Sequence, residues 1–235
     1  MLPVPGPSHA ESRSAAAGVF PLVGALIGGL SVIAGVLAGW LWGDPSRGVC
    51  VLLTWAILSG GLHLDGLADS CDGLLSWQSR ERKLEIMRDS RIGVMGTVGL
   101  FAILALQLAA LLALGEQWWV GAFAAPIWGR WASSYGVSLF PSARRDGLGE
   151  AFQDGARTRV VSATLLALVL SGSLGVLSAA AVVIVAPITH VLALGISARL
   201  GGLTGDTYGA LVETAQTVAL LSLAALAHQG VAIRL

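Results

Sequence analysis

Long stretches without a charged side chain are the feature that most constrains how this chain can fold. Residues 19–42 contain no Asp, Glu, Lys or Arg, and as an α-helix they would be roughly 36 Å long, enough to cross the hydrocarbon core of a bilayer. The mean hydropathy of +0.77 and the 55% share of hydrophobic residues are typical of a membrane protein. Because the apolar runs do not alternate with polar residues, they predict helices and not strands.

The apolar runs predict an all-α, polytopic membrane bundle of about seven transmembrane helices. One run is long enough for two spans that turn near residues 171–178, and another is interrupted by Arg130. The runs lie at residues 19–42, 48–64, 92–115, 117–140, 160–198 and 211–233. The whole chain, residues 1–235, is therefore expected to form a single integral membrane domain.

The distribution of Lys and Arg predicts that the N-terminus faces the cytoplasm, because positively charged loops stay on that side of the membrane. With this orientation, most of the 14 Lys and Arg residues fall in cytoplasmic loops. Residues 1–18 then form a cytoplasmic or interfacial N-terminus. The cytoplasmic loops expected to carry an active site are residues 65–91, 141–159 and 199–210.

The densest group of charges lies between residues 60 and 96, in a chain that is only 12% charged. At about 100° per residue in a helix, Asp65, Asp69 and Asp72 would share one face. Carboxylate oxygens are the ligands that Mg²⁺ prefers, usually together with substrate phosphates, whereas Zn²⁺ favours Cys and His. The spacing predicts a Mg²⁺ or Mn²⁺ site. A solvated helix face with incidental acids is the alternative interpretation.

Further charged residues extend this predicted site. Arg88 and Arg91 are three residues apart on one helix face, so they could bind a pyrophosphate. Arg130 lies within an apolar run, where an arginine is costly unless it pairs or faces a wet cavity. Its expected partner is one of the central carboxylates or a substrate phosphate. Asp206 and Glu213 are seven residues apart, and we expect them on the same side of the membrane, helping to hold metal or substrate.

Carboxylates, arginines and a membrane location together favour metal-assisted phosphoryl or nucleotidyl transfer. A cation-coupled or proton-coupled transporter is the main alternative, because the acids and Arg130 could also line an ion path. Against it, the acids are expected mostly in cytoplasmic segments. A membrane scaffold that binds metal without turnover is a further alternative. No nucleic-acid partner is expected.

Four segments, in order along the chain, resemble the bacterial cobalamin synthase family, the adenosylcobinamide-GDP ribazoletransferases. They are LPVP, FPLVGALIGG, the run GGLHLDGLADSCDGLL followed by ERKLEIMRDSRIG, and LGGLTGDTYGALVE. The resemblance covers almost the whole chain and implies a Mg²⁺-dependent enzyme of the bacterial inner membrane. Family members usually carry a further apolar segment ahead of the L-P-x-P element, whereas this sequence starts at that element.

The resemblance also implies a reaction and residue roles. Adenosylcobinamide-GDP would be joined to α-ribazole or its 5'-phosphate, giving adenosylcobalamin or its 5'-phosphate, together with GMP. His63 would act as a base or a partner for the attacking 3'-hydroxyl, and Asp206 would complete the site or position a substrate. The expected metal ligands, matching the family's acidic motif, are Asp65, Asp69, Asp72 and Asp89. The lipid bilayer, a second copy of the chain and other corrinoid-pathway enzymes are the expected partners.

Overall fold

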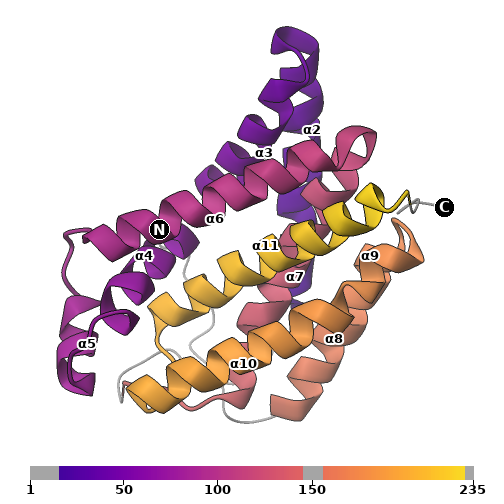
Figure 1. Ribbon diagram of the computed structural model, residues 1–235. Coiled ribbons are helices and arrows are strands. Elements are labelled where there is room, and N and C mark those ends of the chain that lie inside the picture. The colour runs from indigo at the N-terminus through magenta and orange to yellow at the C-terminus, as the bar shows by residue number, and fades with distance from the viewer. Residues whose placement is uncertain (1–15, 145–155, 231–235) are drawn as a thin grey trace, which may run out of the picture.

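The computed structural model describes residues 16–144 and 156–230, and within these ranges the fold is all-α (Figure 1). The elements are η1 (Ala17–Val19), α2 (Phe20–Trp42), α3 (Pro45–Leu58), α4 (Leu62–Leu74), α5 (Arg80–Ile86), α6 (Val94–Ala113), η2 (Gly115–Gln117), α7 (Trp118–Leu139), α8 (Ala156–Gly172), α9 (Val176–Ala180), α10 (Val182–Leu200) and α11 (Gly205–His228). The prediction of an all-α fold is confirmed.

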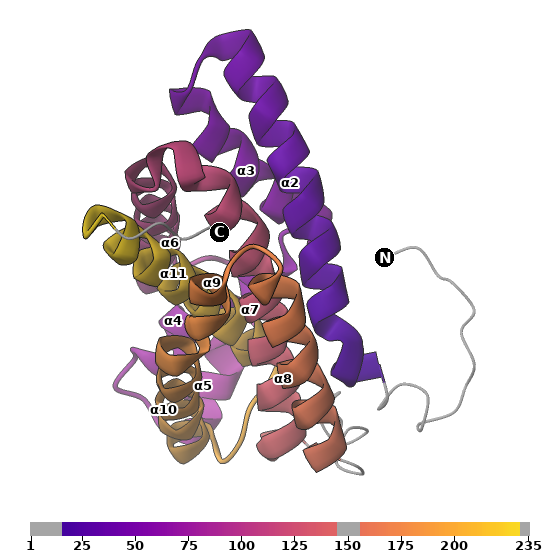
Figure 2. The same cartoon turned by 90° about the vertical axis from the view of Figure 1, so that its right-hand side faces the viewer.

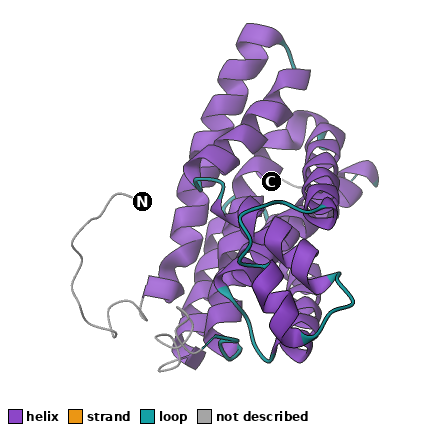
Figure 3. Ribbon diagram, turned by 90° about the vertical axis from the view of Figure 1, so that its left-hand side faces the viewer, coloured by secondary structure: helices purple, strands orange, loops and turns teal. Residues whose placement is uncertain are grey.

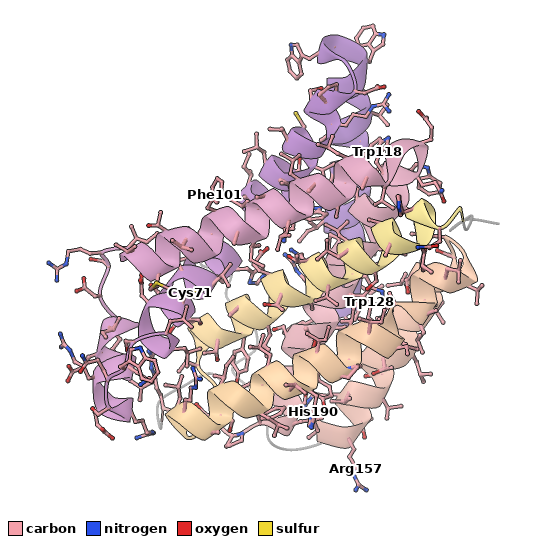
Figure 4. All side chains as sticks on the ribbon, in the orientation of Figure 1. Cys71, Phe101, Trp118, Trp128, Arg157 and His190 are labelled. Atoms are coloured by element: carbon pink, nitrogen blue, oxygen red, sulfur yellow. The ribbon has the colours of Figure 1, made fainter. Side chains whose placement is uncertain are left out.

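Helix α7 forms the centre of the bundle. It packs against α2, α8 and α11, which surround it on different sides (Figures 1 and 2). Most of its residues are buried, and Trp128, labelled in Figure 4, is fully enclosed and donates its indole N–H to the Ser178 carbonyl. Helix α11 lies between α6 and α10, and the three helices run side by side (Figure 1). An interior helix of this kind can carry polar residues that a lipid-facing helix would expose.

The crossing of α2 and α7 depends on two small residues. A Cβ atom added at Gly24 would lie 2.4 Å from the Pro126 carbonyl oxygen, and one added at Gly28 would lie 2.5 Å from the Phe123 carbonyl oxygen. Only glycine allows the two backbones to approach this closely, as is common where membrane helices pack. The long first apolar run is thereby fixed along one side of the central helix (Figure 2).

Four helical stretches in the described ranges are long and apolar enough to cross a membrane: Ala17–Trp42, Val94–Ala113, Val176–Leu200 and Gly205–His228. Helices α3 and α4 form a fifth candidate together, but they are bent by 88°. The structure thus supports a membrane protein with four or five candidate spans, where the apolar runs predicted seven. The two further predicted spans correspond to α7, which other helices enclose, and to α8, which has only 17 residues.

The predicted loop 65–91 is helical at its first three acids, as the spacing predicted, but Arg88 and Arg91 follow the end of α5 and do not share a helix face. Residues 65–91 include most of α4 and all of α5, joined by short loops (Figure 3). Residues 141–144 run beside the connection between α10 and α11: the Ala143 N–H donates to the Leu203 carbonyl, and the Leu203 N–H donates to the Pro141 carbonyl, each at 2.8 Å. Residues 1–15 of the predicted N-terminal segment and residues 145–155 of the second loop lie outside the described residues.

Candidate active site

Helix α4 carries the acidic residues, and a sharp turn sets its direction. Gly60 and Gly61 have φ values of 61° and 71°, a conformation that favours glycine, and they redirect the chain by 88° between α3 and α4. Asp65 is exposed and Asp69 is partly buried. Neither carboxylate accepts a hydrogen bond from another described residue. Two adjacent, unpaired carboxylates are costly to hold together unless a cation or a donor-rich ligand binds them.

A close crossing with α11 brings a third carboxylate to this face. A Cβ at Gly66 would lie 2.5 Å from the Asp206 carbonyl oxygen, and one at Gly209 would lie 2.9 Å from the His63 carbonyl oxygen. Glycine at both positions therefore lets α4 and the start of α11 touch through their backbones. As a result, Asp69 lies within electrostatic reach of both Asp65 and Asp206. The structure thus brings Asp206 to the acidic face of α4, as predicted.

Arg144 supplies positive charge at the edge of this cluster. Its guanidinium lies 3.3 Å from Asp206 Oδ2 and is also within electrostatic reach of Asp69. The Nε atom of Arg144 is buried and has no hydrogen-bond partner among the described residues. Thr204 caps the N-terminus of α11 and also donates to Asp206 Oδ2. The sequence predicted the loop 141–159 but indicated no role for Arg144, because the approach of Arg144 to Asp206 depends on the pairing of residues 141–143 with Leu203.

Asp72 is used differently from its neighbours on α4. Its two carboxylate oxygens accept hydrogen bonds from the backbone N–H groups of Gly93, at 2.7 Å, and Gly96, at 2.8 Å. These groups belong to the first turn of α6, where a helix has unsatisfied N–H donors and a partial positive charge. Asp72 therefore acts as a cap for α6. In this arrangement it fixes α6 to the acidic helix and has less capacity left to ligate a metal.

The remaining charges of the segment divide between paired and free side chains. Asp89 accepts three hydrogen bonds from Arg91, two from the guanidinium and one from the backbone N–H, at 2.7 to 3.1 Å. These bonds lower the pKa of Asp89 to about 2, so it remains ionised and paired. Arg88 is exposed and has no hydrogen-bond or ion-pair partner in the described ranges. The structure thus separates Asp89 and Arg91, which bind each other, from Asp65 and Asp69.

Arg130 and Glu213 belong to a buried polar network inside the bundle. Arg130 donates to Gln216 Oε1 at 2.6 Å, and Glu213 Oε2 accepts from Gln216 and Gln107 at 3.2 and 3.0 Å. Arg130 and Glu213 are only 6% and 5% exposed. The hydrogen-bond partner of Arg130 is thus on α11 and not in the acidic segment, and Glu213 lies about 10 Å further along α11 than Asp206.

Sequence reasoning missed Gln107 and Gln216, although a glutamine within an apolar run is a signal for an interhelical hydrogen bond. His63 is near this network, within electrostatic reach of Arg130. Two residues before Asp65, it lies roughly 160° around α4 from that carboxylate. His63 therefore lies on the side of α4 opposite Asp65, facing the bundle and the buried network.

The donor set suits a hard divalent cation that the substrate helps to bind. Among the described residues, no group of three or more His, Cys, Asp or Glu side chains is arranged to hold a metal ion by itself. Asp65 and Asp69 nevertheless offer unpaired carboxylate oxygens, with Asp206 close by. Mg²⁺ is commonly bound by one or two carboxylates, waters and substrate phosphates instead of a complete protein cage. The residues present therefore fit Mg²⁺ in the presence of a phosphorylated substrate.

These features define a class: a helical membrane protein with an open carboxylate site between two of its helices, beside an arginine. Comparison with known sequences is more specific. The chain belongs to the cobalamin-5-phosphate synthase family, whose model matches residues 1–224.

Several relatives share most of their length with this chain. The adenosylcobinamide-GDP ribazoletransferase of Roseiflexus sp. (strain RS-1) is 46% identical over 230 residues, covering 95% of this chain and 85% of that protein. The protein of the same name from Herpetosiphon aurantiacus is 43% identical over 98% of this chain and 94% of its own length. An Escherichia coli ribazoletransferase (strain HS) is 40% identical over 87% of this chain and 85% of its own. No solved structure matches the chain.

Proposed function

We propose that the acidic face formed by α4 and the start of α11 is where this chain carries out ribazole transfer. Its activity is that of an adenosylcobinamide-GDP ribazoletransferase in cobalamin biosynthesis, as the family match and the full-length relatives indicate. The observation that carries the assignment to this face is the meeting of Asp65 and Asp69, which have no hydrogen-bond partner among the described residues, with Asp206 and Arg144.

Asp65, Asp69 and Asp206 would hold Mg²⁺ together with oxygens of the substrate diphosphate. When bound, the ion would neutralise charge on the phosphate that is attacked and on the departing GMP. Arg144 would bind a non-transferred phosphate oxygen, because its buried Nε has no partner among the described residues while its Nη2 is held at Asp206. Asp72 would contribute by fixing α6 to α4, and not primarily as a ligand.

In the proposed reaction the 3'-hydroxyl of the α-ribazole ribose, or of its 5'-phosphate, attacks the phosphorus attached to the cobinamide arm, and GMP leaves. The hydroxyl loses its proton as the new phosphodiester bond forms. His63 is the predicted acceptor for that proton, and its position facing the bundle means that the ribose would have to enter between α4 and α11. Arg88 is available for the guanosine phosphates, whereas Arg91 would first have to leave Asp89.

The site would face the cytoplasm of a bacterium, in its inner membrane, with the N-terminus on the same side and the apolar runs as its spans. The support for this orientation is the concentration of Lys and Arg in the segments that carry the site. A second copy of the chain and other corrinoid-pathway enzymes are the proposed protein partners. A cation-coupled transporter would instead need its unpaired acids near the bilayer centre, with access from both sides.

Release of GMP tests this proposal. The purified protein in liposomes would receive adenosylcobinamide-GDP, α-ribazole 5'-phosphate and Mg²⁺, beside Asp69→Asn and the control variant Glu81→Gln. Glu81 is an exposed acid on α5, outside the cluster. We expect Asp69→Asn to slow GMP release on the order of 100-fold or more, as when a group stabilising transition-state charge is removed, and Glu81→Gln to keep the wild-type rate.

A full rate in Asp69→Asn would refute the site while leaving the activity intact. Absence of turnover in folded wild-type protein would refute the reaction itself, and ion-flux assays on the same liposomes would then test the transporter. Replacing α-ribazole 5'-phosphate by α-ribazole in the same assay identifies the preferred acceptor.

A further inference from the structure

A groove of about 420 Å³ lies between α4, α10 and α11, on the side of α4 away from the acidic cluster. Its walls are mainly aliphatic, with Leu67 and Leu74 from α4, Leu192 and Ile196 from α10 and Ala210 from α11. At about 100° per residue, Leu67 and Leu74 point roughly 160–180° away from Asp65. The groove therefore lies on another face of α4 than the carboxylates, none of the proposed active-site residues lines it, and its lining suits a hydrocarbon chain.

One end of this groove is cationic. A second hollow of about 400 Å³ shares Leu74, Leu75 and Arg199 with the first and adds Trp77 and Lys83. Arg199 donates to the Leu74 carbonyl at 3.2 Å, and Lys83 Nζ donates to the Gln78 carbonyl, so both cations are held beside the opening. The Trp77 side chain is fully exposed there. A tryptophan beside basic residues is typical of the membrane–water interface.

The groove also holds an unused hydrogen-bonding group and unused space. Ser70 lines it and is only 2% exposed, yet its hydroxyl has no hydrogen-bond partner among the described residues. A buried hydroxyl without a partner is costly. A Cβ added at Gly195, on the opposite wall, would meet no atom within 4 Å. Both observations indicate that a ligand with an apolar body and an acceptor oxygen completes the groove.

We propose that this groove binds one anionic phospholipid of the surrounding bilayer. An acyl chain lies along Leu67 and Ile196, an ester oxygen accepts from the Ser70 hydroxyl, and the phosphate group lies between Arg199 and Lys83. Charge complementarity selects this occupant, because basic pockets between membrane helices attract anionic headgroups. A diphosphate substrate would instead have to leave its charged groups against an aliphatic wall, away from the carboxylates that would hold its metal.

The headgroup part of the proposal is tested by counting retained lipids with native mass spectrometry. The wild-type chain, in nanodiscs of mixed phosphatidylglycerol and phosphatidylcholine, is compared with an Arg199→Gln, Lys83→Gln double variant. One cation near an anionic surface contributes about fivefold in binding. We therefore expect the double variant to lose on the order of 10- to 30-fold in its preference for phosphatidylglycerol. The control Arg82→Gln removes an exposed arginine that pairs with Glu85 outside the groove, and it should keep the preference.

The acyl-chain part is tested by filling the groove. Gly195→Phe adds a ring to the groove wall at a position where the added Cβ would meet no atom within 4 Å, whereas Ala198→Phe adds the same ring to an exposed position of α10 that does not line the groove. Lipid retention should fall to the background of annular lipid for Gly195→Phe alone. Equal retention in both phenylalanine variants, or an unchanged preference in the double cation variant, would overturn the proposal.

A third outcome would reassign the groove. If adenosylcobinamide-GDP or α-ribazole 5'-phosphate displaced the retained phosphatidylglycerol from the wild-type chain in a saturable way, the groove would be a substrate site and the lipid proposal would fail. Lipid retention is measured without turnover, so its result is independent of the GMP-release assay and of the proposed function.

Discussion

Replacing Gly66 by alanine tests whether the close crossing of α4 and α11 sets the geometry of the acidic site. The added Cβ would lie 2.5 Å from the Asp206 carbonyl oxygen and 3.0 Å from the Asp206 Cα. Both atoms belong to the backbone of a helix and cannot rotate away. Because ordinary contact begins near 3.4 Å, the two helices would have to separate by about 0.9 Å at this point, which moves Asp206 away from Asp65 and Asp69.

The size of the effect follows from two opposing contributions. Overpacking at a close contact costs roughly 1–3 kcal/mol, and alanine in a helix interior recovers about 0.5–1 kcal/mol relative to glycine. We therefore expect a net loss of about 1–2 kcal/mol in the free energy of unfolding. Displacing a positioned group by about 1 Å can cost on the order of 100-fold in rate, so kcat for GMP release should fall by roughly 10- to 100-fold.

Thermal unfolding in detergent and GMP release in liposomes measure the two effects. Gly29→Ala is the matched control, since its Cβ would meet only a ring carbon of Phe123 at 3.9 Å, in ordinary contact in the middle of α2. This control should be neutral or slightly stabilising, with an unchanged kcat. If Gly66→Ala behaved like Gly29→Ala in both assays, the crossing would not determine the site geometry.

Asp72→Ala should lower the free energy of unfolding by about 1–2 kcal/mol, because the Gly93 and Gly96 N–H groups lose their acceptor. Asp72→Asn should keep much of this stability in thermal unfolding. It should also slow GMP release less than Asp69→Asn does. Arg130→Met removes the donor to Gln216 Oε1 and the positive charge near buried Glu213, and it should cost roughly 1–3 kcal/mol. A second change, Glu213→Leu, should restore part of this loss, and a double-mutant cycle without coupling would contradict the interpretation. Chelation of divalent ions should abolish GMP release, and Mg²⁺ should restore it; activity that survives chelation would exclude the proposed metal role.

Local sequence features predicted much of the helical framework. The break in the longest apolar run was predicted near residues 171–178, and α8 ends at Gly172 while α9 begins at Val176. Uncharged length is a property of the chain itself, so hydropathy finds such helices reliably. The meeting of Asp206 with the acids of α4 was also predicted, because both segments were assigned to the same side of the membrane.

The parts that sequence reasoning missed all depend on contacts between distant segments. Hydropathy cannot reveal that other helices enclose α7, and an enclosed helix needs no apolar surface toward lipid. The role of Asp72 depends on the position of the N-terminus of α6 relative to α4. The partner of Arg130 depends on which face of α11 points into the bundle. Spacing along one helix placed Asp72 with Asp65 and Asp69, but hydrogen bonds to α6 give it a separate function.

The bend at Gly60 and Gly61 turns α4 by 88° away from the axis of α3. The 14 residues of α3 rise about 21 Å, which is less than the thickness of a bilayer core of about 30 Å. In the proposed orientation, α3 would therefore end before the chain has crossed the core, and α4 would run roughly parallel to the membrane plane from that depth. Hydrated phosphate esters would then have to reach the carboxylates through an opening on the water side, so the metal and Arg144 would have to screen the substrate charge inside the protein and not in lipid.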